Sequence, residues 1–133
     1  MGAAFLDTNI LVYAFTDDPR SARVRELLGQ RPLISVQVLN EFANVARRKL
    51  GLSWDELHEA LAAIRVLCPT VLPLTVETHD AAMALARRYG FSIYDALVVA
   101  AAIAGGCATL WSQDMQHGMT VEPGLTIVDP FRS

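Results

Sequence analysis

Lysine is almost absent from this chain of 133 residues. Ten of its eleven basic residues are arginine, and Lys49 is the only lysine. Cysteine is also scarce. Cys68 and Cys107 lie far apart and match neither a zinc-binding nor a CxxC spacing, so we expect two reduced, buried thiols. A Walker or GxGxxG phosphate loop is missing as well. These absences argue against a zinc module and against the common nucleotide-binding folds.

The chain also has no long apolar run and no large net charge of either sign. The longest apolar run, residues 96–106, falls far short of the ~20 residues that span a bilayer, and the first residues lack the basic start of a secretory signal. We therefore expect a cytoplasmic protein with no membrane contact. The net charge of −3 argues against a generally basic nucleic-acid coat but leaves room for a local basic patch. With 53% hydrophobic and 19% charged residues, the chain should fold as one domain, residues 1–133.

Short apolar runs alternate with helical patterns along the whole chain. The apolar runs predict strands at residues 3–6, 71–74, 108–111 and 126–128, with a further short stretch at 32–34. The periodic segments predict helices at residues 8–15, 19–29 and 36–50, after the capping box that begins at Ser53, from Thr75 or Thr78 to 90, and from Ser92 to 105. This alternation is typical of an α/β fold with a parallel sheet, in which ligands bind beyond the carboxyl ends of the strands.

Four acidic residues stand where acids are unexpected, and each has an ordinary alternative explanation. Asp7 follows the first strand and could simply cap a helix, and Asp114 follows a late strand and could form a turn. Asp95 opens the most apolar helix of the chain, where a helix-dipole role is as plausible as a functional one. Glu41 borders an apolar helix face without a basic partner three or four residues away.

Taken together, these acids predict a metal site. The expected fold places the four carboxylates at one edge of the sheet, where their repulsion calls for a cation. Because the set contains no His or Cys, a hard ion such as Mg²⁺ or Mn²⁺ is favoured, and such ions serve phosphoryl chemistry.

The sequence resembles the PIN-domain ribonucleases, and among them the VapC-type toxins of toxin–antitoxin pairs. The resemblance extends over essentially the whole chain and lies in four segments: Asp7-Thr8-Asn9 after an apolar strand, Ser35 to Phe42 around Glu41, Tyr94 to Ala101 around Asp95, and Ser112 to Gly118 around Asp114. All four acidic positions of the family pattern are occupied.

The resemblance implies a three-layer PIN-like α/β fold with a short central parallel sheet between helices. It also implies a metal-dependent endoribonuclease in which Asp7, Glu41, Asp95 and Asp114 hold one or two Mg²⁺ or Mn²⁺ ions. Of these, Asp7 and Asp95 would be direct ligands. Glu41 would act through water. Thr8, Asn9 and Ser112 would orient the carboxylates. The partners implied are an RNA substrate, a cognate antitoxin and a second copy of the chain in a homodimer.

Two other functions remain open from the sequence alone. A PIN-like module could bind RNA or protein without cutting it. A phosphoacceptor receiver domain has a similar sheet and acidic pocket, but it needs a lysine near the end of a late strand, and Lys49 falls on a helix. His117 is interpreted as part of the loop structure rather than as a general base. Seven arginines could contact RNA phosphates: Arg20, Arg23, Arg25, Arg47, Arg48, Arg87 and Arg88. A solvated helix face is the more ordinary explanation for each of them.

Overall fold

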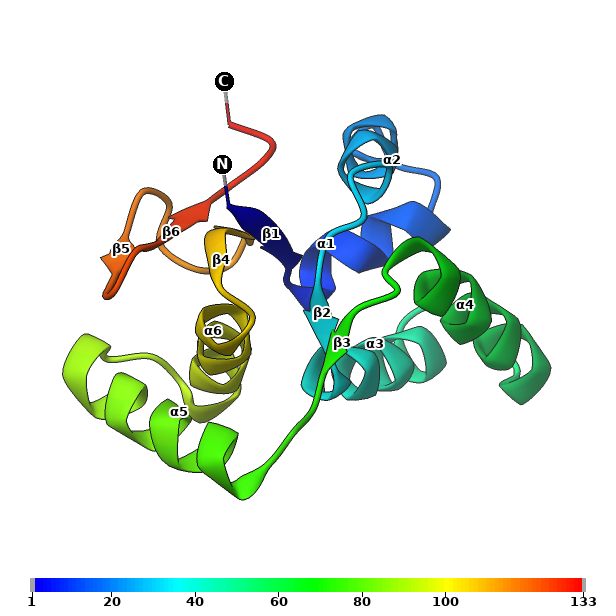
Figure 1. Ribbon diagram of the computed structural model, residues 1–133. Helices are drawn as coiled ribbons and strands as arrows, with labels where there is room; N and C mark the ends of the chain where they lie inside the picture. Colours follow the sequence, from blue (N-terminus) through cyan, green and yellow to red (C-terminus); the bar gives the residue numbers. More distant parts are fainter. Residues whose placement is uncertain (1, 133) are drawn as a thin grey trace.

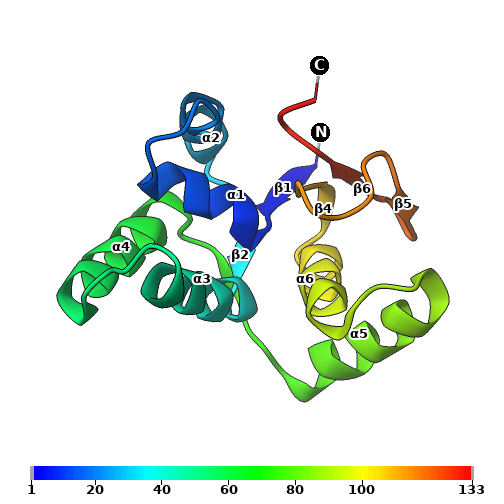
Figure 2. The ribbon, with the colours of Figure 1, turned by 180° about the vertical axis from the view of Figure 1, so that it is seen from behind.

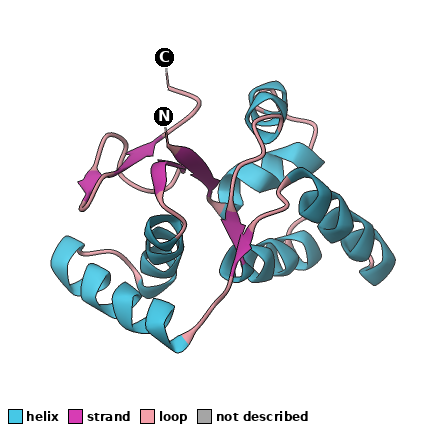
Figure 3. Cartoon of the chain, in the orientation of Figure 1, coloured by secondary structure: helices cyan, strands magenta, loops and turns pink. Residues whose placement is uncertain are grey.

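Strands and helices alternate throughout the computed structural model, which describes residues 2–132 (Figures 1 and 3). The strands are β1 (Ala3–Leu6), β2 (Ile34–Ser35), β3 (Val71–Leu72), β4 (Cys107–Trp111), β5 (Thr120–Val121) and β6 (Leu125–Val128). The helices are α1 (Thr8–Val12), a 3₁₀ turn η1 (Tyr13–Phe15), α2 (Ser21–Leu28), α3 (Val36–Arg48), α4 (Trp54–Leu67), α5 (Val76–Tyr89) and α6 (Ile93–Ala104).

The strands form a mainly parallel sheet. The larger part has the order β1-β4-β6-β5, in which β4 lies parallel to both β1 and β6 and only β5 is antiparallel. The smaller part is the parallel pair β2 and β3. Leu33, just before β2, joins the two parts: its N–H donates to the Ala4 carbonyl at 2.8 Å, and its own carbonyl accepts from the Leu6 N–H at 3.0 Å. The carboxyl ends of β1 and β4 therefore meet at one edge.

Helices cover both sides of the strands. Helices α1, α2, α3 and α4 lie to one side, and α5 and α6 lie to the other, in both views of the chain (Figures 1 and 2). Helix α6 packs against β4 and β2, while α5 packs on the outer side of α6. This arrangement confirms the three-layer α/β fold that the sequence predicts.

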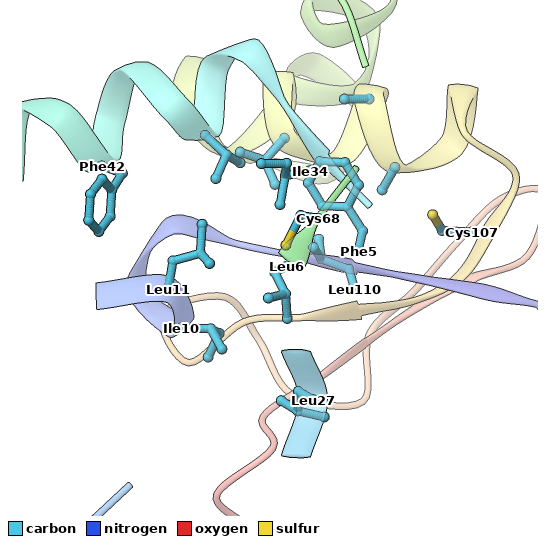
Figure 4. Packing of buried hydrophobic residues seen from close by; sticks show 14 of the residues in the cluster. Phe5, Leu6, Ile10, Leu11, Leu27, Ile34, Phe42, Cys68, Cys107 and Leu110 are labelled. Carbon is cyan, nitrogen blue, oxygen red and sulfur yellow. The ribbon is translucent and has the colours of Figure 1, made fainter. Parts of the chain in front are cut away.

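The core lies between these layers and follows from the apolar strand sequences. Phe5, Ile34, Leu110 and Ile127 come from four different strands and are completely buried. Phe42 of α3 belongs to the same core, and Figure 4 shows it with Phe5, Ile34 and Leu110. Burying each such side chain stabilises the folded state by roughly 1.5–3 kcal/mol. The central helix α6 has an unbroken buried run from residue 96 to 102, in agreement with its apolar sequence. The strand ends are thereby held in a rigid frame.

Side-chain caps begin the helices where the sequence predicts them. The Ser35 and Ser92 hydroxyls accept from the backbone N–H groups three residues later, as does Thr75 at the start of α5. Ser53 forms the complete capping box with Glu56. Each cap contributes on the order of 1 kcal/mol. Two of these caps, at α3 and α6, position helices that carry candidate site residues.

Several predicted boundaries are wrong for identifiable reasons. The helix predicted from residue 19 begins at Ser21, because the Asp18 carboxylate accepts from the Arg20 N–H at 2.8 Å and closes a turn instead. The segment 8–15 divides into α1 and η1. Strand β3 ends at Leu72, since Pro73 has no N–H to donate. Strand β5 is missing from the prediction, because Thr120 and Val121 do not belong to an apolar run.

Both cysteines behave as predicted. Cys68 and Cys107 are free and buried, and burial raises the pKa of the Cys68 thiol to about 11. Across residues 2–132, none of the helices combines the length and apolar character that crossing a membrane requires.

Candidate active site

A cleft of about 430 Å³ opens at the edge of the sheet where β1 and β4 end. All four acidic residues singled out from the sequence line it. Each comes from a different part of the chain: the end of β1, helix α3, the start of α6 and the turn after β4. The complete lining is Asp7, Thr8, Asn9, Val12, Tyr13, Glu41, Asn44, Val45, Lys49, Asp95 and Asp114.

Asp7 is the most deeply placed of these carboxylates, with 5% of its surface exposed. Its backbone N–H donates to the Trp111 carbonyl at 3.0 Å, so the end of β1 is fixed against the end of β4. One carboxylate oxygen accepts from the Thr8 N–H at 2.7 Å and caps α1. The other accepts from the Ser112 hydroxyl at 2.8 Å. The capping role and the place in the cleft are therefore compatible.

Burial dominates the electrostatics of Asp7. Its pKa is raised from 3.8 to about 7, mainly because burial removes the carboxylate from water, although the hydrogen bonds from Ser112 and Thr8 oppose that rise. The negative charges of Glu41 and Asp95 contribute smaller parts of the rise. The free protein thus holds a carboxylate that stays ionised at neutral pH only with difficulty, which is the condition that a bound cation would relieve.

Glu41 lies in the second turn of α3, facing α1. One of its carboxylate oxygens accepts from the Thr8 hydroxyl at 2.9 Å, and the side chain is half-buried. Burial raises its pKa, the Thr8 and Gln37 side chains lower it, and the charge of Asp95 raises it. Thr8 consequently links two carboxylates, through its N–H to one and its hydroxyl to the other.

Asp95 lies in the first turn of α6 and is half-buried. Ser92 caps the helix by accepting from the Asp95 N–H at 3.2 Å, but in the described chain no carboxylate hydrogen bond returns to the Ser92 N–H, so the capping box is incomplete. Burial raises the pKa of Asp95, the Ser92 hydroxyl lowers it, and the charge of Asp114 raises it again. Its carboxylate is therefore not used to cap the helix.

Asp114 is exposed, in a turn tied to the rest of the cleft by its neighbours. The Ser112 hydroxyl accepts from the Met115 N–H at 3.3 Å. The Gln113 N–H donates to the Asn9 side chain at 3.3 Å, and the Gln113 side chain accepts from the Tyr13 hydroxyl at 2.6 Å. Asn9 thus holds the loop that carries Asp114, whereas Thr8 and Ser112 donate directly to carboxylates.

The donor set fits a hard divalent cation in its chemistry, because it consists of carboxylate oxygens and contains no thiol or imidazole. Across residues 2–132, however, no three His, Cys, Asp or Glu side chains converge on one point as a preformed metal-binding group. Burial is the main reason that the pKa values of Asp7, Glu41 and Asp95 are raised, and the negative charges of neighbouring carboxylates add to the rise.

Sequence reasoning missed Lys49 and Tyr13 in the lining. The signal for Lys49 was available, because Glu41, Val45 and Lys49 recur every four residues and share one face of a helix. Tyr13 carried no comparable signal, since its position depends on the turn from α1 into η1.

The candidate arginines lie elsewhere: none of the seven lines the cleft as the structure describes it between residues 2 and 132. Several have other partners. Arg20 pairs with Asp18 and Arg88 with Glu122. Arg47 stacks over Trp54 at 4.3 Å from the ring centre.

Comparison with known proteins agrees with this geometry. The PIN domain family matches residues 4–117, which is most of the chain. The chain belongs to the PIN domain family. A search of curated proteins gives no match to this PIN domain. The family confirms the resemblance seen in the sequence and excludes the receiver-domain alternative.

Two solved structures share the fold. VapC20 of Mycobacterium tuberculosis, a toxin that cleaves the sarcin-ricin loop, is 21% identical, with a TM-score of 0.65 over 84% of this PIN domain and 90% of VapC20. A chain of a toxin–antitoxin complex from Klebsiella pneumoniae is 18% identical, with a TM-score of 0.69 over 98% of this chain and 100% of its own.

Proposed function

We propose that this PIN domain is a metal-dependent endoribonuclease and the toxin of a toxin–antitoxin pair. One observation carries the nuclease proposal: four carboxylates from four separate segments line a single cleft at the carboxyl ends of the parallel strands. A structural protein has no need to gather negative charge in this way, because each added carboxylate destabilises its neighbours.

Asp7 and Asp95 are the proposed direct ligands of Mg²⁺ or Mn²⁺, with Glu41 acting through water and Asp114 at the exposed side. When bound, such an ion polarises the scissile phosphate and lowers the pKa of water, so that hydroxide is available as the nucleophile near neutral pH. Because the cleft residues do not converge as they stand, we expect small inward movements of the half-buried Glu41 and Asp95 and of the exposed Asp114 on metal binding.

The surrounding polar residues keep the carboxylates in place for that purpose. Thr8 and Ser112 supply three hydrogen bonds to Asp7 and Glu41, all between 2.7 and 2.9 Å. His117 is exposed, and its Nδ1 accepts from the Asp129 N–H at 3.0 Å, so its ring stabilises the loop. No role for His117 as a general base is proposed.

The proposal of a toxin role rests on the two similar solved structures. VapC20 is described as a sarcin-ricin loop cleaving toxin, and the Klebsiella chain comes from a toxin–antitoxin complex. This support extends to a cognate antitoxin as partner, and we further propose that the chain forms a homodimer.

An RNA cleavage assay tests the nuclease proposal. We expect the purified protein to cut single-stranded RNA with Mg²⁺ or Mn²⁺ and to stop in excess EDTA. Asp95→Asn should lose most of that activity, whereas Asp80→Asn, which removes the same charge from an exposed position of α5, should keep it. RNA binding without any cutting would instead favour the non-cleaving PIN-like module.

Growth measurements test the toxin proposal separately. Expression of the wild-type chain alone should arrest growth, expression of Asp95→Asn should not, and co-expression with the product of a neighbouring antitoxin gene should restore growth. Normal growth of cells that contain active, RNA-cutting protein would contradict the toxin role while leaving the nuclease intact.

A further inference from the structure

Among residues 2–132, one basic side chain lines the acidic cleft, and it belongs to the only lysine of the chain. Lys49 lies at the end of α3, is exposed, and lines the same cleft as the four carboxylates. We propose that Lys49 forms a subsite that binds an RNA phosphate other than the scissile one. This inference rests on the proposed nuclease function and adds a residue that positions the substrate.

The helix geometry separates Lys49 from the candidate metal site. Glu41, Val45 and Lys49 follow one another at four-residue intervals, so they lie on one face of α3. Eight residues of α-helix correspond to about 12 Å along the axis. The lysine is therefore placed to meet a different part of an extended RNA strand from the part at the carboxylates, with Val45 of the lining between them.

Lys49 does not serve as an internal counter-ion for the acids. The ion pairs within residues 2–132 are Arg20–Asp18, Arg23–Glu26 and Arg88–Glu122, and Lys49 takes part in none of them. The ammonium group is thus available for an anion from outside, and the backbone of RNA supplies one at each nucleotide.

The ordinary alternative is that Lys49 only complements the dipole at the carboxyl end of α3. Arg47 and Arg48 already occupy the last turn of that helix. Arg47 is engaged, because its guanidinium donates to the Leu52 carbonyl at 2.7 Å and stacks over Trp54. Arg48 is exposed and does not line the cleft, so it provides a matched control for a cation at the same helix end.

The experiment measures binding of a short fluorescein-labelled single-stranded RNA of mixed sequence. The protein carries Asp7→Asn throughout, which prevents cleavage, and Lys49→Ala, Lys49→Arg and Arg48→Ala are compared in Mn²⁺ over a range of salt concentrations. Cleavage by the corresponding proteins with Asp7 intact is measured in parallel.

We expect Lys49→Ala to weaken RNA binding about tenfold. The slope of log affinity against log salt should become shallower by about 0.7, which corresponds to one lost phosphate contact on a single strand. Lys49→Arg should restore most of the affinity, and Arg48→Ala should change it less than about twofold. In the cleavage assay, Lys49→Ala should raise KM and leave kcat nearly unchanged, because the lost contact is made equally before and during the reaction.

Equal effects of Lys49→Ala and Arg48→Ala on affinity and salt slope would overturn the proposal, as would a Lys49→Ala protein that binds RNA like its parent. Wild-type protein that binds RNA without cutting it would refute the nuclease function, and the Lys49 comparison would still decide the subsite. Protein that neither binds nor cuts RNA would refute both.

Discussion

Replacing Asp7 with asparagine should stabilise the metal-free protein, and by an amount that depends on pH. Asp7 is 5% exposed, and burial is the main reason that its pKa rises from 3.8 to about 7. Asparagine has nearly the same shape, can keep the hydrogen bond from the Thr8 N–H and can donate to the Ser112 hydroxyl, but it carries no charge. The substitution therefore removes the cost of ionising a buried group while keeping most of the local contacts.

The magnitude follows from the pKa. One pKa unit corresponds to about 1.4 kcal/mol, so ionised Asp7 costs the folded state about 4 kcal/mol at pH 8. Near pH 4 the carboxyl is largely protonated in the folded state and only partly ionised in the unfolded state, so the cost is small. Between these limits the folded protein holds a proton that the unfolded chain has lost. The free energy of unfolding of the wild type accordingly falls as pH rises from about 4 to 7.

Urea unfolding in excess EDTA at pH 5 and pH 8 measures this difference. The free energy of unfolding of Asp7→Asn, relative to wild type, should grow by about 3 kcal/mol between the two pH values, or roughly 10 °C in Tm for a chain of this size. Asp80→Asn serves as the control, because it removes a carboxylate that is exposed on α5. A difference between Asp7→Asn and wild type that is the same at both pH values would refute the reasoning.

Three further predictions concern the same site and the assembly. Ser112→Ala removes the 2.8 Å hydrogen bond to buried Asp7, so it should lower the free energy of unfolding by about 1–3 kcal/mol, and more at pH 8 than at pH 5, because that bond lowers the pKa of Asp7. Calorimetric melting of Asp95→Asn in EDTA should give a Tm no lower than that of wild type, since burial and, to a smaller extent, the charge of Asp114 disfavour the ionised carboxylate. Mn²⁺ should raise the Tm of the mutant less than that of wild type, and equal responses would mean that Asp95 only begins a helix. Light scattering should give the mass of a homodimer at micromolar concentration, and a monomer mass would contradict that expectation.

Much of the fold could be predicted because local and long-range preferences agree. The helix starts at Ser35, Ser53 and Ser92 follow from side-chain caps, and the apolar run of α6 predicts its central place. The prediction fails where a long-range contact or a very local contact determines where a helix begins or whether a strand forms. The Asp18 turn delays α2, and β5 is a two-residue strand that exists only through its pairing with β6.

The site was predictable in its acids but not in its full lining. Asp7 and Asp114 follow strands, and the rule for parallel sheets places both at the ligand edge. The half-burial of Asp95 and the hydrogen bond from the Thr8 hydroxyl to Glu41 depend on how α1, α3 and α6 pack, and no periodicity in the sequence reports that packing. The same holds for the hydroxyl of Tyr13 on the Asp114 loop.

In the proposed mechanism, the four-carboxylate cleft cuts RNA with a divalent ion held by its own side chains. The most direct measurement compares Mn²⁺ binding, followed by calorimetry, with the initial rate of RNA cleavage over the same range of Mn²⁺ concentration. We predict that binding and cleavage reach half-saturation at the same concentration and that Asp7→Asn weakens both. Cleavage that continues undiminished in excess EDTA, or Mn²⁺ binding that Asp7→Asn leaves unchanged, would contradict the account.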